Sequence, residues 1–125
     1  MPDRRLHLKF DEYLRNKGII HGYTYGYMVH DRMDRNAHKI GHWKHREWDY
    51  YHSEEGIRDW LGRWEHLAYQ ETLTDYLRIA LGHIVLDEIW SRRGYEFESE
   101  DELIKSAYRS FIARGYHRKF YKSRK

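Results

Sequence analysis

The sequence predicts an all-α protein, and three observations carry that prediction. Apolar residues recur at three- and four-residue intervals along most of the 125-residue chain, which is the period of an amphipathic helix. The single proline stands at position 2, so none interrupts the periodic segments. The length suits one domain, and the chain shows no internal repeat or low-complexity segment. We therefore expect a compact single domain over residues 1–125, a bundle of five or six helices around a buried helix at about residues 75–93, with a basic C-terminal tail at about 115–125.

Residues 4–17 are predicted to form the first helix. Its apolar side chains have helical spacing, and Gly18 suits the left-handed position that often follows a helix end. Residues 19–26 form a connector rich in glycine and tyrosine. A second helix is expected from residue 27 to about residue 40, where Gly41 ends or kinks it.

Polar residues mark the starts of the later helices. Ser53 followed by two glutamates is typical of an N-cap with acids at the positive end of a helix dipole, and this helix should run to about Tyr69. Thr72 or Thr74 is expected to cap the central helix. The S-x-x-E pattern of residues 99–102 is a capping box for the last helix, which should end near Gly115.

The central helix at 75–93 carries the first chemical signal. Apolar residues cover most of its circumference, so it should be buried nearly all round. His83 and Asp87 stand four residues apart on one face, and a buried aspartate needs a cation, a metal or good hydrogen-bond donors. Gly82 costs a helix interior roughly 1 kcal/mol relative to alanine, which suggests that a neighbouring backbone or a ligand comes close.

The second signal is the segment from residue 30 to residue 52, which holds five histidines and three aspartates. Histidine is the commonest protein ligand for transition metals. On a helix His30, Asp34, His38 and His42 follow one another at four-residue steps, so that neighbours can share a metal but all four cannot. A second element must complete such a site, and the His83–Asp87 pair is the best candidate. The alternative is a helical face whose histidines hydrogen-bond to Asp, Glu or Tyr.

The order of these residues resembles a known family. Asp31 or Asp34, then Gly41, His45-Arg46 and His52-Ser53, followed by the later His-x-x-x-Asp, is similar to the small all-helical metal-dependent hydrolases related to zinc phospholipase C, with their HR-then-HS signature. The similarity covers residues 30 to 90; here residues 47–51 separate the two histidine motifs more widely than in that family. It implies a divalent zinc, manganese or nickel ion held by ligands drawn from one set of residues. These are Asp34, His45, His52, His83 and Asp87.

Two further residues and a second family belong to this hypothesis. Arg46 is expected to steady an anionic phosphoester substrate, and Asp31 is a second candidate catalytic residue. A looser similarity links the chain to HD-type phosphohydrolases. It rests on His21, His30-Asp31 and Asp87.

Composition limits the other functions. The chain has no cysteine, which leaves only nitrogen and oxygen metal ligands and fits a cytoplasmic protein. We expect no signal peptide and no membrane span. Aromatic residues make up 17% of the chain, so some aromatic surface is expected to face a partner. A second copy of the chain is one such partner. A glycine-rich phosphate loop, G-x-S-x-G and H-E-x-x-H are all missing, so nucleotide-loop, serine-hydrolase and zincin functions lack their signatures.

The C-terminal end suggests the alternative function. From residue 103 onward the chain has eight Lys/Arg residues and no acid, against a net charge of only +3 for the whole. Such a segment with interleaved aromatics suits nucleic acid, and binding should be salt-dependent. Its removal should leave stability nearly unchanged. The alternative is thus a small helical binding or assembly protein whose nucleic-acid contacts include Arg114, Arg118, Lys119 and Lys122.

Overall fold

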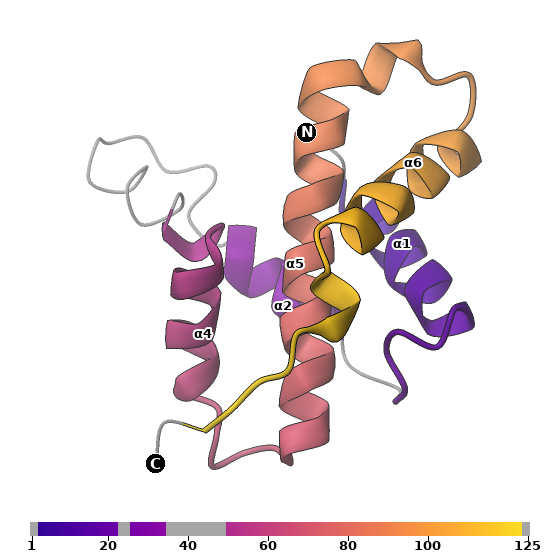
Figure 1. Ribbon diagram of the computed structural model, residues 1–125. Helices are drawn as coiled ribbons and strands as arrows, with labels where there is room; N and C mark the ends of the chain where they lie inside the picture. The colour runs from indigo at the N-terminus through magenta and orange to yellow at the C-terminus, as the bar shows by residue number, and fades with distance from the viewer. Residues whose placement is uncertain (1–2, 23–25, 35–49, 124–125) are drawn as a thin grey trace, which may run out of the picture.

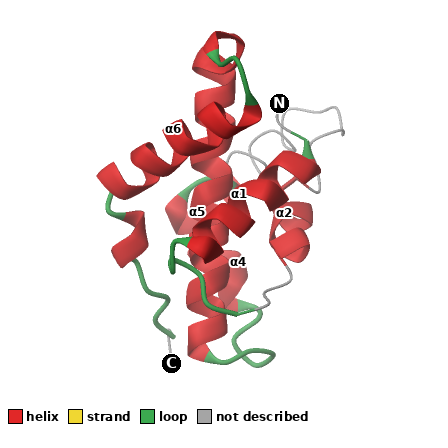
Figure 2. Ribbon diagram, turned by 90° about the vertical axis from the view of Figure 1, so that its right-hand side faces the viewer, coloured by secondary structure: helices red, strands yellow, loops and turns green. Residues whose placement is uncertain are grey.

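The computed structural model describes residues 3–22, 26–34 and 50–123, and this part of the chain is all-helical (Figure 1). The long helix α5 (Gln70–Arg93) stands at the centre. Helix α4 (Glu54–Gly62) runs along one side of it, and α1 (Arg4–Asn16) and α6 (Glu100–Ala113) lie on the other. Turning the molecule by 90° brings α1 in front of α5, with α2 (Gly26–Asp34) beside it (Figure 2). The all-α prediction is therefore confirmed.

Helix α5 is the buried centre that the sequence predicts, but it begins at Gln70, five residues early. Its N-cap is Tyr69, whose side chain makes no capping bond. Thr72 and Thr74 lie inside the helix, so the predicted threonine cap is wrong. The hydroxyl of Thr74 instead accepts a hydrogen bond from the backbone N–H of Tyr121 at 3.1 Å. A threonine inside a helix is free to serve a neighbouring segment in this way.

Helix α1 packs closely on α5 at a glycine. Asp3 caps α1 by accepting from the N–H of Leu6, and Gly18 beyond its end has φ +75° as predicted. A Cβ at Gly82 would lie 3.1 Å from Cε2 of Phe10 and 3.3 Å from Cδ1 of Leu14. The glycine of the central helix is thus explained by the approach of another helix, which is one of the two reasons the sequence suggested.

Helices α2 and α4 both pack against α5. The second predicted helix starts at Gly26 and is described to Asp34; its expected continuation through residues 35–40 lies outside the described residues. Ser53 caps α4 by accepting from the N–H of Gly56, as predicted. Helix α4 ends at Gly62 and not near Tyr69. Leu67 and Tyr69 are 71% and 82% exposed, so the apolar stripe does not continue into the core there.

The last helix has the predicted boundaries, but the segment after it does not behave as a solvated tail. Ser99 caps α6, and Gly115 follows its end with φ +73°. The chain then turns through η2 (Tyr116–Arg118) and crosses α5 towards α4 (Figure 1). Tyr121 is only 1% exposed, and its carbonyl accepts from the side chain of Gln70 at 2.6 Å. Residues 116–121 therefore belong to the folded domain.

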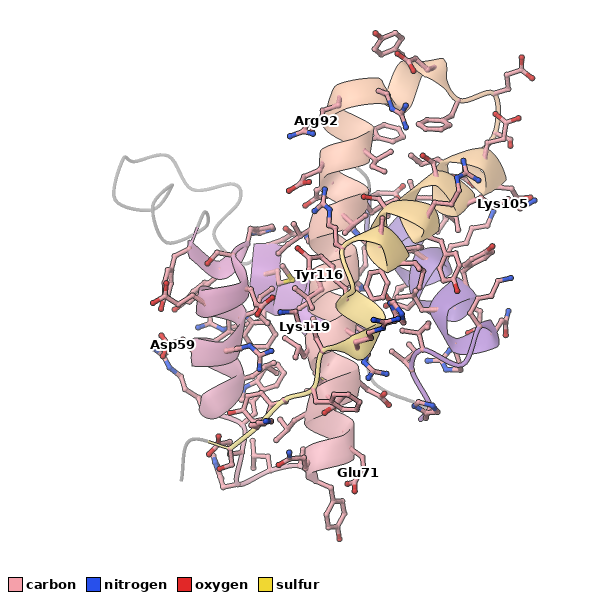
Figure 3. The ribbon with its side chains drawn as sticks, in the orientation of Figure 1. Asp59, Glu71, Arg92, Lys105, Tyr116 and Lys119 are labelled. Carbon is pink, nitrogen blue, oxygen red and sulfur yellow. The ribbon has the colours of Figure 1, made fainter. Side chains whose placement is uncertain are left out.

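Lys119 binds this segment to the rest of the domain through its side chain and its carbonyl. Nζ of Lys119, in the stretch that leads towards α4 (Figure 3), lies 3.4 Å from Oε1 of Glu54 at the start of that helix. The guanidinium of Arg78 on α5 donates to the carbonyl of Lys119 at 3.0 Å and to that of Ile19 at 2.7 Å. Arg78 thus ties two separate segments to the central helix. Among the described residues, no helix is both long enough and apolar enough to cross a bilayer.

Candidate metal centre

Three segments bring four potential ligands to one point. Asp34 comes from the end of α2, His52 lies two residues before α4, and His83 and Asp87 lie one turn apart on α5. One donor atom from each lies within 4.8 Å of the other three. His83 is fully buried, while the side chains of Asp34 and His52 are 29% and 9% exposed. The site therefore has a buried wall on α5 and access to solvent beside Asp34.

The separations between the donor atoms match those of metal ligands. Nε2 of His83 lies 3.3 Å from Nε2 of His52, 3.2 Å from Oδ1 of Asp34 and 3.2 Å from Oδ2 of Asp87. Nε2 of His52 lies 3.4 Å and 3.7 Å from the same two oxygens. Ligands about 2.0–2.1 Å from a tetrahedral metal are about 3.3–3.4 Å apart. Five donor pairs thus fall at or near the edges of one coordination tetrahedron.

Asp87 is oriented by a histidine that the sequence analysis did not assign. Nε2 of His7 on α1 donates to Oδ1 of Asp87 at 3.1 Å, and His7 is only 1% exposed. This leaves Oδ2 of Asp87 buried and facing Nε2 of His83 at 3.2 Å and Nε2 of His52 at 3.7 Å. A buried carboxylate oxygen needs a proton donor or a cation beside it. A protonated Nε2 of His83 meets that need in the metal-free protein, and a cation between Asp87 and the two histidines would meet it in the same place.

His83 is held through its other ring nitrogen. Its Nδ1 lies 2.8 Å from Nδ1 of His30 on α2, and Nε2 of His30 lies 2.6 Å from Oδ2 of Asp11 on α1. The 2.8 Å separation is a hydrogen-bond distance and is shorter than the edge of a metal site. His30 is therefore a hydrogen-bond partner of His83 here, although the nitrogens of His7, His30 and His83 also cluster closely.

The pKa values of the ionisable groups in the site are shifted because the groups are buried and lie close together. Burial disfavours the charged form of His83, but its hydrogen bonds to Asp34 and Asp87 outweigh burial and raise the pKa of His83 to about 9. Burial works to raise the pKa of Asp34 and Asp87, yet hydrogen bonds from the histidines hold both below the ordinary value. Burial lowers the pKa of His7 to about 4. The site thus has two carboxylates that stay ionised and one imidazole, that of His83, that holds a proton tightly.

Of the five predicted metal ligands, the structure brings four together: Asp34, His52, His83 and Asp87. His45 and the predicted catalytic Arg46 lie outside the described residues. Asp31, the other catalytic candidate, is half exposed, and its Oδ1 lies 3.0 Å from Arg4 and outside the cluster.

The looser set based on HD-type phosphohydrolases does not assemble as a group. His30 and Asp87 lie at the centre, but His21 is 72% exposed and has Asp75 as its neighbour, at 3.8 Å. Asp31 is the outward-facing residue paired with Arg4.

The sequence analysis did not assign His7 or Asp11, and it did not identify Asp11 and His83 as the partners of His30. A signal was present, because the pattern His-x-x-x-Asp occurs four times, at residues 7–11, 30–34, 45–49 and 83–87. On a helix this spacing puts the histidine and the aspartate on one face. The copies on α1, α2 and α5 face the same centre, and the copy at 45–49 lies outside the described residues.

The predicted nucleic-acid residues do not form one free surface. Arg114 is paired with Glu88 and Lys119 with Glu54, while Arg118 and Lys122 are exposed. Four arginines instead line a groove of about 620 Å³ between α5 and α6. Its arginines are Arg92, Arg93, Arg109 and Arg114.

Comparison of the chain with protein-family models, with curated proteins and with solved structures gives no match. The similarity to the metal-dependent hydrolases therefore stays a prediction from the sequence.

Proposed function

We propose that the protein is a metal-dependent hydrolase of a phosphoester, with a divalent ion held by Asp34, His52, His83 and Asp87. The observation that supports the proposal is the convergence of four donor atoms, from three segments of the chain, at the separations expected of the ligands of one metal ion. Two imidazoles and two carboxylates suit zinc, manganese or nickel. The buried wall formed by His83 and Asp87 would hold the ion, and the more exposed Asp34 side would admit water and substrate.

The chemistry follows from what such an ion does to water and to an ester. A bound divalent ion supplies hydroxide near neutral pH and polarises a phosphoryl oxygen. The protein's own contribution is to keep both carboxylates ionised and to hold His83 in one orientation. Arg46 is kept in this proposal as the residue that steadies the anionic substrate.

The first test is metal content and metal-dependent stability. Tag-free protein should contain a stoichiometric divalent metal, and its thermal unfolding temperature should fall in EDTA and recover with added Zn²⁺, Mn²⁺ or Ni²⁺. His83→Ala and Asp87→Asn should abolish the recovery. His66→Ala is the matched control, because His66 is exposed at the far end of α4. A wild-type protein with neither metal nor a shift would overturn the proposal.

The second test is catalysis. Metal-loaded protein should hydrolyse p-nitrophenyl phosphate or bis(p-nitrophenyl) phosphate above the rate of the free metal, and His52→Ala should remove that activity. Carboxylic and glycosidic p-nitrophenyl substrates serve as controls for the bond cleaved. Hydrolysis of those alone would overturn the phosphoester assignment while leaving the metal centre in place.

A second candidate function rests on the arginine-lined groove. Arg92 and Arg109 have no ion-pair partner within the part of the chain that the structure describes, and Glu88 is the acid on the groove wall. Such a groove suits the phosphates of single-stranded nucleic acid. Binding of a fluorescent oligonucleotide should weaken with salt and weaken further in Arg109→Glu, whereas Arg63→Glu on α4 makes the same charge change elsewhere. Equal effects of the two variants would leave only non-specific charge attraction.

A further inference from the structure

Three buried side chains from three helices form one hydrogen-bonded line that ends at the metal centre. Oδ2 of Asp11 on α1 lies 2.6 Å from Nε2 of His30 on α2, and Nδ1 of His30 lies 2.8 Å from Nδ1 of His83 on α5. These residues are 4%, 2% and 0% exposed. Neither Asp11 nor His30 is among the five predicted metal ligands. The line is therefore a separate feature of the site.

The order of donors along the line follows from hydrogen-bonding rules. Burial raises the pKa of Asp11, and its contact with His30 opposes that rise. In its ionised form Asp11 only accepts, so Nε2 of His30 carries the hydrogen, and Nδ1 of a neutral His30 is then an acceptor. Nδ1 of His83 must carry the hydrogen of the next bond. The one remaining lone pair of His83 lies on Nε2, which faces His52, Asp34 and Asp87. The negative charge of Asp11 thus fixes, two residues away, which nitrogen of His83 is free to bind a metal.

We propose that Asp11 and His30 are positioning residues that hold His83 in the metal-binding tautomer and orientation; this role rests on the proposed metal centre. Histidine ligands commonly donate their second N–H to a fixed acceptor, which orients the ring and makes the ligating nitrogen more basic. Here the acceptor is a neutral imidazole, itself oriented by a carboxylate. Neither Asp11 nor His30 touches the ion.

The packing around Asp11 supports a built-in role. A Cβ at Gly26, the first residue of α2, would come too close to Oδ2 of Asp11, so a larger residue there would force the carboxylate to shift from its position against His30. Oδ1 of Asp11 is buried without a hydrogen-bond partner among the described residues. Keeping that oxygen unpaired is unfavourable for folding alone, and such costs concentrate at functional sites.

The ring packing points the same way. His83 stacks on His7 with ring centroids 3.8 Å apart and an interplanar angle of 7°, while the ring of His30 lies 5.1 Å from that of His83. Stacking restricts the tilt of the imidazole but still permits a half-turn about its Cβ–Cγ bond, which would carry Nδ1 away from His30. The hydrogen bond to His30 opposes that half-turn, so the stacking and the hydrogen bond are complementary.

The test compares metal affinity in variants that keep the ligands. Zn²⁺ affinity is measured by competition with a chromophoric chelator for wild type, His30→Phe and His30→Gln. His30→Phe keeps an aromatic ring but removes the acceptor, and it should weaken Zn²⁺ binding about 10–100-fold. His30→Gln offers an amide oxygen to His83 and should recover part of that loss. Val29→Ala, a buried change on the same helix, is the control for general destabilisation and should keep the wild-type affinity.

A spectroscopic measurement on the wild type makes the test independent of any variant. Long-range ¹H–¹⁵N spectra of the Zn²⁺-loaded protein should show His83 protonated at Nδ1 and His30 protonated at Nε2. The opposite tautomer of His83, or equal Zn²⁺ affinity in wild type and His30→Phe, would overturn the positioning role while the metal centre stands. A wild type that takes up no Zn²⁺ would instead overturn the metal centre and this role together.

Discussion

His83 is the residue on which the chemistry of the proposed site depends, because the metal would compete with a proton for its Nε2. The nearby carboxylates hold the pKa of His83 at about 9 despite its burial, so the metal-free protein carries a proton there at neutral pH. The carboxylates that hold the proton are Asp34 and Asp87, the same residues that would hold the metal. In the proposed centre the metal would therefore replace this proton.

This competition predicts how metal affinity depends on pH. Because one proton must leave Nε2 before the ion binds, Zn²⁺ affinity should rise about tenfold per pH unit from pH 6.5 towards 8.5 and level off near 9. Calorimetry in buffers of different ionisation enthalpy should show about one proton released per ion at pH 7. A pH-independent affinity over this range would show that His83 is not a ligand. His66→Ala should keep the wild-type slope.

His7 predicts a pH effect on the stability of the metal-free protein. Burial lowers the pKa of His7 to about 4, whereas an unfolded histidine titrates near 6.5. As pH falls from 6.5 to 4 the unfolded chain takes up a proton that folded His7 does not, so stability is lost, at up to about 1.4 kcal/mol per pH unit. Urea unfolding in EDTA at pH 4.5, 5.5 and 6.5 should show this slope. His7→Phe should flatten it; an unchanged slope in that variant would refute the assignment.

Helix α5 shows what the sequence could and could not predict. Periodicity located the central helix, and Ser53, Ser99, Gly18 and Gly115 marked helix ends, because capping is a local interaction. The start of α5 and the end of α4 were misplaced, because those positions depend on where the exposed Leu67 and Tyr69 leave the core, which is a tertiary property.

The site was only partly predictable, because local patterns show single pairs of residues but not which helices pack together. The His83–Asp87 pair was visible as two polar residues on a buried helix, and His52 and Asp34 came from the similarity in residue order. His7 and Asp11 lie far from these in sequence and on a helix that looked like ordinary amphipathic packing. Only the repeated His-x-x-x-Asp pattern linked them, and spacing of that kind does not reveal which helices meet.

The contact between α1 and α5 can be tested at Gly82. A methyl group there would meet Phe10 at 3.1 Å and Leu14 at 3.3 Å, both on the neighbouring helix. Gly82→Ala should therefore cost about 1–3 kcal/mol from overpacking, offset by up to about 1 kcal/mol of helix propensity. Gly62→Ala is the matched control, since its nearest neighbour, the hydroxyl of Tyr121, would be at an ordinary 3.5 Å. Equal unfolding midpoints in urea for the two variants would contradict the close packing.

The C-terminal segment joins the two sides of the molecule. After α6 the chain crosses α5 to reach α4, so one extended stretch contacts elements on both sides of the central helix (Figure 1). Arg78 reinforces it by bonding both Lys119 in this stretch and Ile19 in the connector after α1. The basic end thus combines a charge pattern typical of a binding tail with the packing of a structural strap.

Tyr121 decides between these two roles. Its ring is 1% exposed and its backbone N–H and carbonyl bond to Thr74 and Gln70, so Tyr121→Ala should destabilise the protein by about 3 kcal/mol or more, in the range of large buried aromatic truncations. Lys122→Ala, one residue on and exposed, should change the free energy of unfolding by less than about 0.5 kcal/mol. Urea unfolding of both variants gives the comparison. If the segment were only a solvated tail, Tyr121→Ala would match Lys122→Ala; a large difference means that any ligand of the basic end binds a rigid surface built into the fold.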